Sequence, residues 1–320
     1  MAEPRFLHAA SPLAGLRDRL DGLAGMLETP TGLIQGWSSL PDLLAGCGGD
    51  PAERRAAFRA HRLADLSMQD PLTEACWSHG PDVGQMMPFL FSDHPVLGRS
   101  AEQRLRQAGR TGQTIFSVSS HLPFAEGLRE RCRFAARMVD ALAEGRGDGR
   151  GDGRVLSLGA GLLPEAALAR HAGDVARWTV YEKSVLSMDQ LLGMHGLMRG
   201  LDVNLADPLR ALLGGRQGGT FDLVLLGPLL DGLDDATARR AVDSAFALLR
   251  PGGSLFMGSF AEDLTDAAYL DVVLDWRPEL RSQVEMERLA AGLPADDVAG
   301  MESFRGPSRT MNFLQVTRRG

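Results

Sequence analysis

The sequence VLSLGAGLLPE at residues 155–165 constrains the fold more than any other part of the chain. Residues 155–158 form a short, mostly apolar run, which is typical of a strand inside a parallel sheet. Gly159 and Gly161 permit a tight turn that brings a nucleotide-like ligand close to the N-terminus of the following alanine-rich helix. This order of strand, glycine turn and helix predicts a nucleotide-binding α/β sheet.

Two further predicted strands end near acidic residues. Residues 177–182 predict a strand ending at Glu182, about twenty residues past the glycine turn, where nucleotide-binding α/β proteins place the carboxylate that binds the ribose hydroxyls. Residues 201–208 predict a strand ending at Asp207, which such a sheet positions to accept a hydrogen bond from an adenine amino group. Both carboxylates are therefore candidate nucleotide contacts.

The rest of the second half continues the alternation of strands and helices. Further buried strands are expected at residues 220–227 and 248–257, and residues 311–317 predict an antiparallel hairpin partner at the sheet edge. Helices are expected at residues 185–198, 236–249, 270–276 and 283–291.

The first 115 residues predict a helical unit without strands. Ser11 and Pro12 are a favourable helix start, and residues 51–68 predict a second helix. Prolines and glycines predict a loop with short helical pieces at residues 29–50, and an ordered, packed loop at residues 78–91.

A long helix is predicted at residues 123–143, followed by a glycine-rich repeat without apolar residues at 145–153, which we expect to be a flexible linker. Arg131 borders the apolar face of this helix, so it needs an anionic partner, either a protein carboxylate or a ligand carboxylate. We therefore expect a helical cover domain at residues 1–115 and a nucleotide-binding domain at residues 116–320.

The composition excludes several function classes. A net charge of −7 argues against a nucleic-acid partner, which would require a basic face. Cys47, Cys76 and Cys132 are far apart, which predicts no metal site and suits a reducing cytoplasm. No signal sequence or apolar stretch of membrane-spanning length is evident. We expect a soluble cytoplasmic protein with a small-molecule substrate, no membrane partner and an undetermined oligomeric state.

Several polar residues have alternative interpretations. Candidate polar contacts are His79, Asp82 and His94, and candidate bases are His121, His171 and His195. The alternative interpretation is that each is an ordinary surface, loop or helix residue without a role in a site. None has the spacing of metal ligands.

Together these motifs resemble the class I S-adenosylmethionine-dependent methyltransferases. Residues 155–161 correspond to the glycine-rich motif, Glu182 to the acid after the second strand, residues 221–224 to the fourth strand and residues 249–253 to the turn before the fifth. The resemblance implies an enzyme with a Rossmann-like α/β fold, in which a mostly parallel sheet has an antiparallel edge strand. It also implies S-adenosylmethionine, as methyl donor or as the substrate itself. The cofactor contacts expected besides the two carboxylates and Arg131 are Ser157, Gly159, Ala160, Gly161, Lys183, Ala206 and Gly227.

A narrower set of motifs is similar to bacterial proteins of extracellular-factor, or 3-hydroxypalmitic acid methyl ester, biosynthesis. The matching segments are residues 84–87, 129–131, 156–161 with Glu165, 275–276 and 312–314. This similarity reaches from about residue 70 to the C-terminus and implies a biosynthetic role in secondary or signal metabolism.

Two departures from the class I pattern concern the methionine tail of the cofactor. Ser157 stands where many class I methyltransferases carry an acid, and residues 162–164 replace the third glycine. The tail is then held from elsewhere, with Arg131 as the candidate for its carboxylate and Glu165 as the alternative partner of that arginine. Tyr181 is a candidate for cation–π contact with the sulfonium, or it packs in the strand.

Three functions remain open. The leading one is methylation of a small molecule on oxygen or nitrogen, since residues 227–230 lack the Asp/Asn-Pro-Pro-Tyr motif of amino-group methyltransferases of nucleic acids. The second releases methylthioadenosine, by cyclisation of the methionine tail to azetidine-2-carboxylate or by aminocarboxypropyl transfer. The third is a non-catalytic partner protein that binds the cofactor.

Overall fold

The computed structural model of the protein describes residues 12–80, 82–145, 153–215 and 219–320, without the side chains of residues 12–14 and 79. The chain divides into two compact units. The helical unit comprises residues 1–81, 104–122 and 265–277, and the sheet unit comprises residues 82–103, 123–264 and 278–320. This division differs from the single boundary expected after residue 115. The expected linker falls largely on residues 146–152, outside the described residues.

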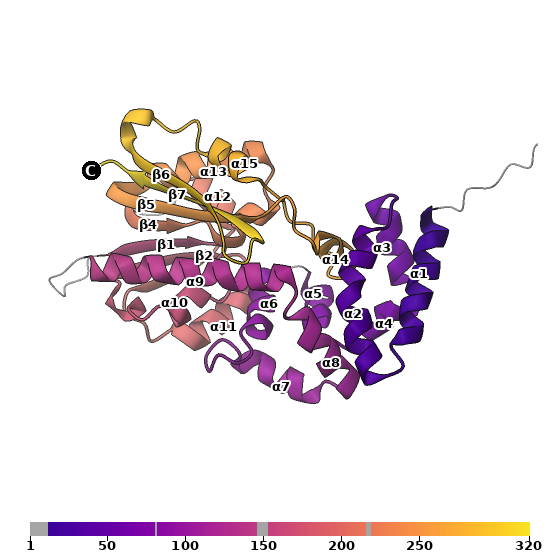
Figure 1. The fold of residues 1–320 in the computed structure, drawn as a ribbon. Coiled ribbons are helices and arrows are strands. Elements are labelled where there is room, and N and C mark those ends of the chain that lie inside the picture. The colour runs from indigo at the N-terminus through magenta and orange to yellow at the C-terminus, as the bar shows by residue number, and fades with distance from the viewer. Residues whose placement is uncertain (1–11, 81, 146–152, 216–218) are drawn as a thin grey trace, which may run out of the picture. The chain divides into compact units, whose positions relative to one another are not determined.

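A seven-stranded sheet forms the centre of the sheet unit (Figure 1). Its strands are β1 (Arg154–Leu158), β2 (Arg177–Glu182), β3 (Leu201–Leu205), β4 (Phe221–Leu225), β5 (Leu249–Phe260), β6 (Val298–Arg305) and β7 (Met311–Arg318). Their order is β3-β2-β1-β4-β5-β7-β6, and β7 runs antiparallel to both of its neighbours while the other pairs are parallel. The predicted mostly parallel Rossmann-like sheet is confirmed.

The centre of this sheet is β1, which pairs with β2 on one side and β4 on the other. Ser157 lies between Val180 of β2 and Leu225 of β4. The direction of the strand order reverses here, and ligands of open α/β sheets bind beyond the carboxyl ends of the strands at such a point.

The antiparallel end of the sheet differs in one detail from the sequence prediction. The strand expected at the edge is β7, which lies one position inward, and β6 forms the edge. Residues 299–302 of β6 are all exposed, so the strand lacks the alternation of apolar and polar residues that would have revealed it.

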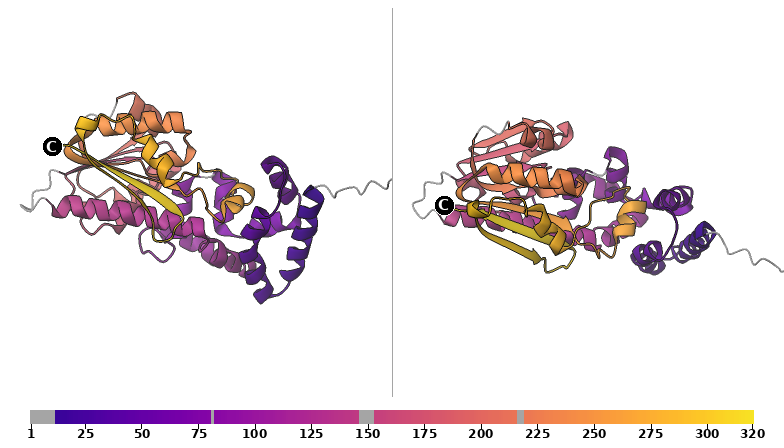
Figure 2. Two further views of the ribbon diagram at one scale, coloured as in Figure 1. Left: turned by 45° about the horizontal axis from the view of Figure 1, so that its top comes forward. Right: turned by 90° about the horizontal axis from the view of Figure 1, so that it is seen from above.

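Helices cover both faces of the sheet. α9 (Pro123–Glu144), α10 (Pro164–Leu168) and α11 (Val185–His195) lie on one face, and α12 (Pro208–Leu213), α13 (Asp235–Ala247) and α15 (Gln283–Leu289) lie on the other (Figure 1, Figure 2). The remaining elements are α6 (Val83–Leu90), α7 (Arg99–Gln107) and the 3-10 helices η1 (Ala172–Asp174), η2 (Gly227–Gly232) and η3 (Ala295–Asp297). The long predicted helix is α9, whose apolar stripe is buried. The boundary between residues 103 and 104 falls inside α7.

The helical unit contains no strand among its described residues. Its helices are α1 (Pro12–Met26), α2 (Pro30–Ala45), α3 (Pro51–Arg59), α4 (Arg62–Ser67), α5 (Pro71–His79), α8 (Arg110–Ser119) and α14 (Ala267–Val272). The predicted helix at residues 51–68 is divided into α3 and α4, because the His61 ring accepts a hydrogen bond from the Leu63 amide and starts a new helix there.

Two segments expected to be loops are helices. In α2, the Thr29 side chain caps the first turn and Pro30 occupies the first helical position, while Pro41 lies inside the helix. Burial of Trp37 and of the leucines along the same face outweighs the hydrogen bond that Pro41 removes. The segment at residues 78–91 likewise contains the end of α5 and all of α6, which includes Pro88.

One part of the helical unit comes from the second half of the chain. Residues 265–277, between β5 and α15, belong to this unit. Trp37 Nε1 donates to the Tyr269 hydroxyl at 3.3 Å, Trp77 Nε1 donates to the Val273 carbonyl at 2.7 Å, and Arg55 pairs with Asp271. The sequence predicts a helix here but not the unit to which it belongs.

Candidate functional site

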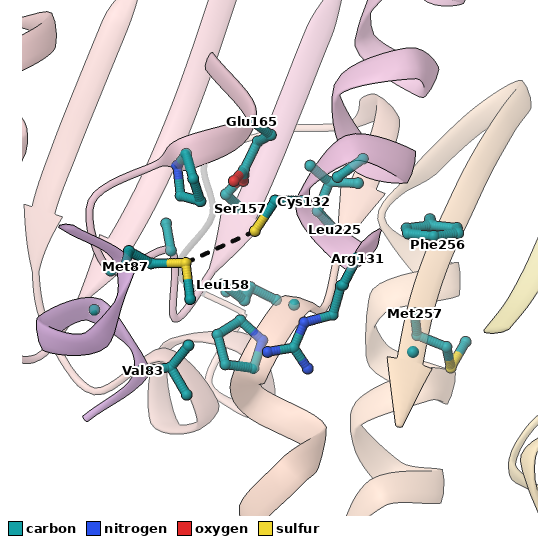
Figure 3. A pocket seen from close by; sticks show the side chains of 18 residues that line it. Val83, Met87, Arg131, Cys132, Ser157, Leu158, Glu165, Leu225, Phe256 and Met257 are labelled. Carbon is teal, nitrogen blue, oxygen red and sulfur yellow. Dashed lines mark hydrogen bonds between the residues drawn. The ribbon is translucent and has the colours of Figure 1, made fainter. Parts of the chain in front are cut away.

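A narrow cavity lies beyond the carboxyl ends of β1, β4 and β5, at the point where the strand order reverses (Figure 3). Its walls come from α6, α9, the glycine turn after β1 and the start of α10 in addition to these strands. All of these elements belong to the sheet unit. The cavity volume is about 40 Å³, enough for a few water molecules.

The cavity brings together about half of the predicted site residues. Those that line it are Arg131, Ser157, Ala160, Gly161 and Gly227. Those that do not line it are Gly159, Tyr181, Glu182, Lys183, Ala206 and Asp207. The first group surrounds the place expected for the methionine tail, and Glu182 and Asp207 of the second group are the residues predicted to bind the adenosine.

The glycine turn has the left-handed backbone that its sequence predicts. Gly159 and Gly161 have φ values of 69° and 55°. A Cβ atom on Gly161 would lie 2.7 Å from Gly84 Cα, because α6 packs directly on the turn. Leu163 also has a positive φ, 54°, so a leucine keeps the conformation typical of glycine at a cost of about 1–2 kcal/mol.

Glu182 binds the glycine turn itself. Its Oε2 accepts a hydrogen bond from the Gly161 amide at 2.8 Å, and its Oε1 accepts one from the Ser184 amide at 2.8 Å. Burial raises the pKa of this carboxyl, and the nearby Asp82 carboxylate adds to the rise, although the two amides oppose it. The predicted ribose-binding acid is thus held at the turn, at the end of β2.

Asp82 fixes the start of α6 over the same turn. Its Oδ1 accepts from the Gly84 amide at 2.8 Å and caps the helix. Ser187 of α11 donates to Asp82 Oδ2 at 3.4 Å and accepts from Gln85 Nε2 at 3.0 Å. Asp82 therefore has a structural role at the start of α6, beside residues that line the cavity.

Arg131 has a protein partner that the sequence did not indicate. Its Nη1 donates to Asp231 Oδ1 at 3.0 Å and to Oδ2 at 2.9 Å, and both side chains are buried. Glu165, the alternative partner considered from the sequence, instead accepts from Ser157 Oγ at 3.1 Å. Within the described ranges, Nε and Nη2 of Arg131 have no hydrogen-bond partner, and the guanidinium points into the cavity (Figure 3). These two nitrogens are available to a ligand carboxylate.

The loop that carries Asp231 is held by Arg281, another residue that no sequence motif indicated. The Arg281 side chain is almost fully buried, with an exposed fraction of 2%. Its Nη1 donates to the Leu230 carbonyl at 3.1 Å, its Nη2 donates to the Leu233 carbonyl, and its Nε donates to Asp235 at 3.1 Å. Arg281 thereby fixes η2 and, through it, the partner of Arg131.

The structure does not bring Tyr181 to the cavity. The ring packs in the core of the sheet unit with residues of α12 that include Ala211 and Leu212, which corrects the expected sulfonium contact and agrees with its alternative. Lys183 and Asp207 are exposed, and Asp207 Oδ1 caps α12 by accepting from the Arg210 amide at 2.8 Å.

The candidate histidine bases are not among the residues that line the cavity. His195 is buried with Nε2 3.2 Å from the Leu162 carbonyl, and burial lowers its pKa. His121 contacts the Ser117 carbonyl, and His171 contacts Asp174. Burial raises the pKa of Cys132, which does line the cavity, to about 12, so this thiol stays protonated.

The described residues lack two kinds of feature. They contain no group of three or more histidine, cysteine or acidic residues placed to hold a metal ion. They also contain no helix long and apolar enough to cross a membrane.

No known family model matches the chain, and neither does any curated protein. Among solved structures, one similar to it is a "possible exported protein" from Bordetella parapertussis, with a TM-score of 0.55 and 15% identity over 98% of this chain and 100% of that chain. Another is the CurJ carbon methyltransferase, with a TM-score of 0.51 and 11% identity over 97% of this chain and 91% of that chain. At these identities the similarity concerns the fold alone, and the protein has the Rossmann-like fold of the class I methyltransferases.

Proposed function

We propose that the protein is an S-adenosylmethionine-dependent transferase that methylates a small molecule on oxygen or nitrogen. The observation that carries the proposal is the guanidinium of Arg131 in the cavity beside β1 and β4. Asp231 holds one of its nitrogens and leaves two for a carboxylate. Glu182 lies at the end of the adjacent strand and is tied to the same glycine turn. The chain thus offers a cation for the carboxylate of the methionine tail and an acid for the ribose.

The proposed acceptor is a small carboxylic acid, hydroxy acid or amine. The negative net charge disfavours a nucleic-acid substrate, and a carboxylate acceptor needs no general base. This suits a cavity without a histidine in its wall. The segments similar to 3-hydroxypalmitic acid methyl ester biosynthesis include the cavity residues Gly84, Met87 and Arg131, so hydroxy fatty acids are the first acceptors to test.

The proposal also places the reaction in the cytoplasm. Cys47, Cys76 and Cys132 are all buried thiols, as expected in a reducing compartment. Fractionation of the producing cells is the test, and recovery of the protein outside the cytoplasm would contradict this part of the proposal.

The test is product analysis with purified protein. Incubation with S-adenosylmethionine labelled on its methyl group and a panel of hydroxy acids and amines is expected to give labelled product and S-adenosylhomocysteine. Glu182→Ala is expected to abolish turnover, whereas the exposed Glu287→Ala on α15 is the matched control. Binding of the cofactor without turnover of any acceptor would favour a non-catalytic binding protein.

A second candidate is release of methylthioadenosine, favoured by the position of the ionisable groups that line the cavity. They are Arg131, Glu165 and the neutral Cys132, and Glu165 is the carboxylate in this lining that is available to the amine of the tail. In the cyclisation, the amine nitrogen of the tail bonds to its own γ-carbon as the bond from that carbon to sulfur breaks. The proton lost from the amine passes to water, and the products are azetidine-2-carboxylate and methylthioadenosine. Mass spectrometry without any acceptor distinguishes the candidates, because only cyclisation then gives methylthioadenosine in step with the amino acid.

A further inference from the structure

A buried chain of three side chains, from β2, β1 and α10, ends at the cavity, where Ser157 and Glu165 line the wall. Trp178 Nε1 on β2 donates to Ser157 Oγ on β1 at 3.0 Å, and Ser157 Oγ donates to Glu165 Oε1 on α10 at 3.1 Å. An indole N–H can only donate, so the Ser157 oxygen accepts from it and the hydroxyl proton is directed at the carboxylate. Ser157 therefore accepts from Trp178 and donates to Glu165, and this hydrogen bond holds the carboxyl group in place.

Glu165 is a buried acid with no ion-pair partner among the described side chains. Its exposed fraction is 8%, and it lines the cavity. In the described part of the chain no basic side chain forms an ion pair with it, since Arg131 is engaged by Asp231. Burial raises the pKa of Glu165, and its hydrogen bonds and the charge of Arg131 only partly oppose the rise. A buried carboxylate gains most from a cationic group that enters the same space.

Arg131 and Glu165 thus present opposite charges to one cavity. Arg131 keeps two nitrogens for a ligand carboxylate beside its contact with Asp231, whereas the proposed function assigns no role to Glu165. A free amino acid group carries both complementary charges, a carboxylate and an ammonium.

We propose that Glu165 binds the ammonium group of the methionine tail of S-adenosylmethionine, and that Ser157 and Trp178 position it for this contact. The proposal rests on the proposed function, because it assumes that this ligand enters the cavity. Arg131 holds the carboxylate of the same tail through Nε and Nη2. Ser157 and Trp178 are positioning residues that act through Glu165.

The test compares ligands that differ only in the tail. S-adenosylhomocysteine carries the ammonium and the carboxylate, its decarboxylated form keeps only the ammonium, and methylthioadenosine has neither. Calorimetric titration of Glu165→Gln is expected to show at least about tenfold weaker binding of the first two ligands and methylthioadenosine binding unchanged within about twofold. Arg131→Met is expected to weaken S-adenosylhomocysteine but not its decarboxylated form.

Matched variants keep the proposal falsifiable if Glu165→Gln folds poorly. Ser157→Ala retains the carboxylate but frees it to turn, and is expected to weaken both ammonium ligands a few-fold with no effect on methylthioadenosine. Glu287→Gln, an exposed change on α15, is expected to alter nothing. Equal weakening of all three ligands, or no weakening of any, overturns the role of Glu165. If the unaltered protein binds none of the three, the proposed function itself fails, and this proposal fails with it.

Discussion

Arg131 Nη1 contacts both carboxylate oxygens of Asp231, at 2.9 and 3.0 Å, across a sequence separation of 100 residues. The two side chains have exposed fractions of 6% and 3%, so this is a buried ion pair. Only one of the guanidinium nitrogens carries it, which distinguishes this pair from the bidentate arrangement in which two nitrogens engage one carboxylate. A structural pairing and a ligand contact are therefore compatible on the same arginine.

Removal of this arginine is the first prediction. Arg131→Met leaves the Asp231 carboxylate buried without a partner and is expected to lower the free energy of unfolding by about 3–5 kcal/mol. Urea denaturation without ligand measures it. Arg133→Met is the matched control on the same helix, because Arg133 pairs with Glu126 at the surface and that change should cost less than about 1 kcal/mol. Similar losses of unfolding free energy in both variants would show that the buried pair stabilises the protein no more than the surface pair does. The double variant Arg131→Met/Asp231→Leu should recover most of the loss.

The contact between Gly161 and Gly84 gives a second prediction. Gly161→Ala is expected to destabilise the protein by at least about 2 kcal/mol, because its φ is 55° and the new methyl group would meet Gly84 Cα. Gly84→Ala has no backbone strain of this kind, but its methyl group would lie 2.9 Å from Ser187 Oγ and 3.0 Å from Gly161 Cα. Gly84→Ala should therefore move α6 away from the turn and destabilise the protein less than Gly161→Ala does.

The control for both glycines is Gly193→Ala in α11. A Cβ atom there meets nothing within 4 Å, so the change should leave stability equal or raise it by up to about 1 kcal/mol. Thermal unfolding of the three variants ranks them. A Gly161→Ala variant as stable as Gly193→Ala would mean that α6 does not pack on the turn in solution.

Short-range signals explain why the sheet was predictable. β2 begins and ends where the sequence placed it, and β1, β4 and β5 follow from apolar runs beside Gly159 and the turn at residues 250–253. The glycine turn was likewise predictable, because its left-handed backbone requires particular residues. These features depend on neighbours in sequence.

The partners of the site residues depend on distant contacts and left no such signal. Asp231 and Arg281 meet the cavity region only through the fold, 100 and 150 residues after Arg131. Pro41 and Pro88 suggested loops, whereas buried side chains on α2 and α6 outweigh one missing hydrogen bond in each helix. Ser157 was recognised as a departure from the class I pattern, but only the structure shows that Glu165 contacts it.

Arg281 gives a third prediction, about the loop that carries Asp231. Arg281→Met removes the donors to the buried carbonyls of Leu230 and Leu233 and is expected to lower the free energy of unfolding by about 3–5 kcal/mol. Arg281→Lys should recover little, because one ammonium cannot reproduce the planar fork of donors. The exposed Arg288→Met on α15 is the control. Denaturation curves measure the stability of the three variants. An Arg281→Lys variant as stable as the unaltered protein would contradict the prediction.

The helical unit contains a buried acid of its own. Asp70 is fully buried and accepts hydrogen bonds from Thr73 Oγ1 and Ser119 Oγ, both at 2.8 Å, and from the Leu72 amide at 3.1 Å. Burial raises the pKa of Asp70 from 3.8 to about 6, although these hydrogen bonds oppose the rise. The folded protein therefore keeps this proton over a pH range in which the unfolded chain has lost it.

The fourth prediction follows from that difference in proton binding. Because the pKa of Asp70 is higher in the folded state, its contribution to stability is greatest below pH 4, falls as the pH rises towards 6, and is constant above that. A shift of about two units corresponds to roughly 3 kcal/mol. Asp70→Asn cannot titrate, so its free energy of unfolding relative to the unaltered protein should improve by roughly that amount between pH 4 and pH 7. Urea denaturation across this range measures the change, with the exposed Asp18→Asn as control. Parallel pH profiles for the unaltered protein and Asp70→Asn would refute the raised pKa.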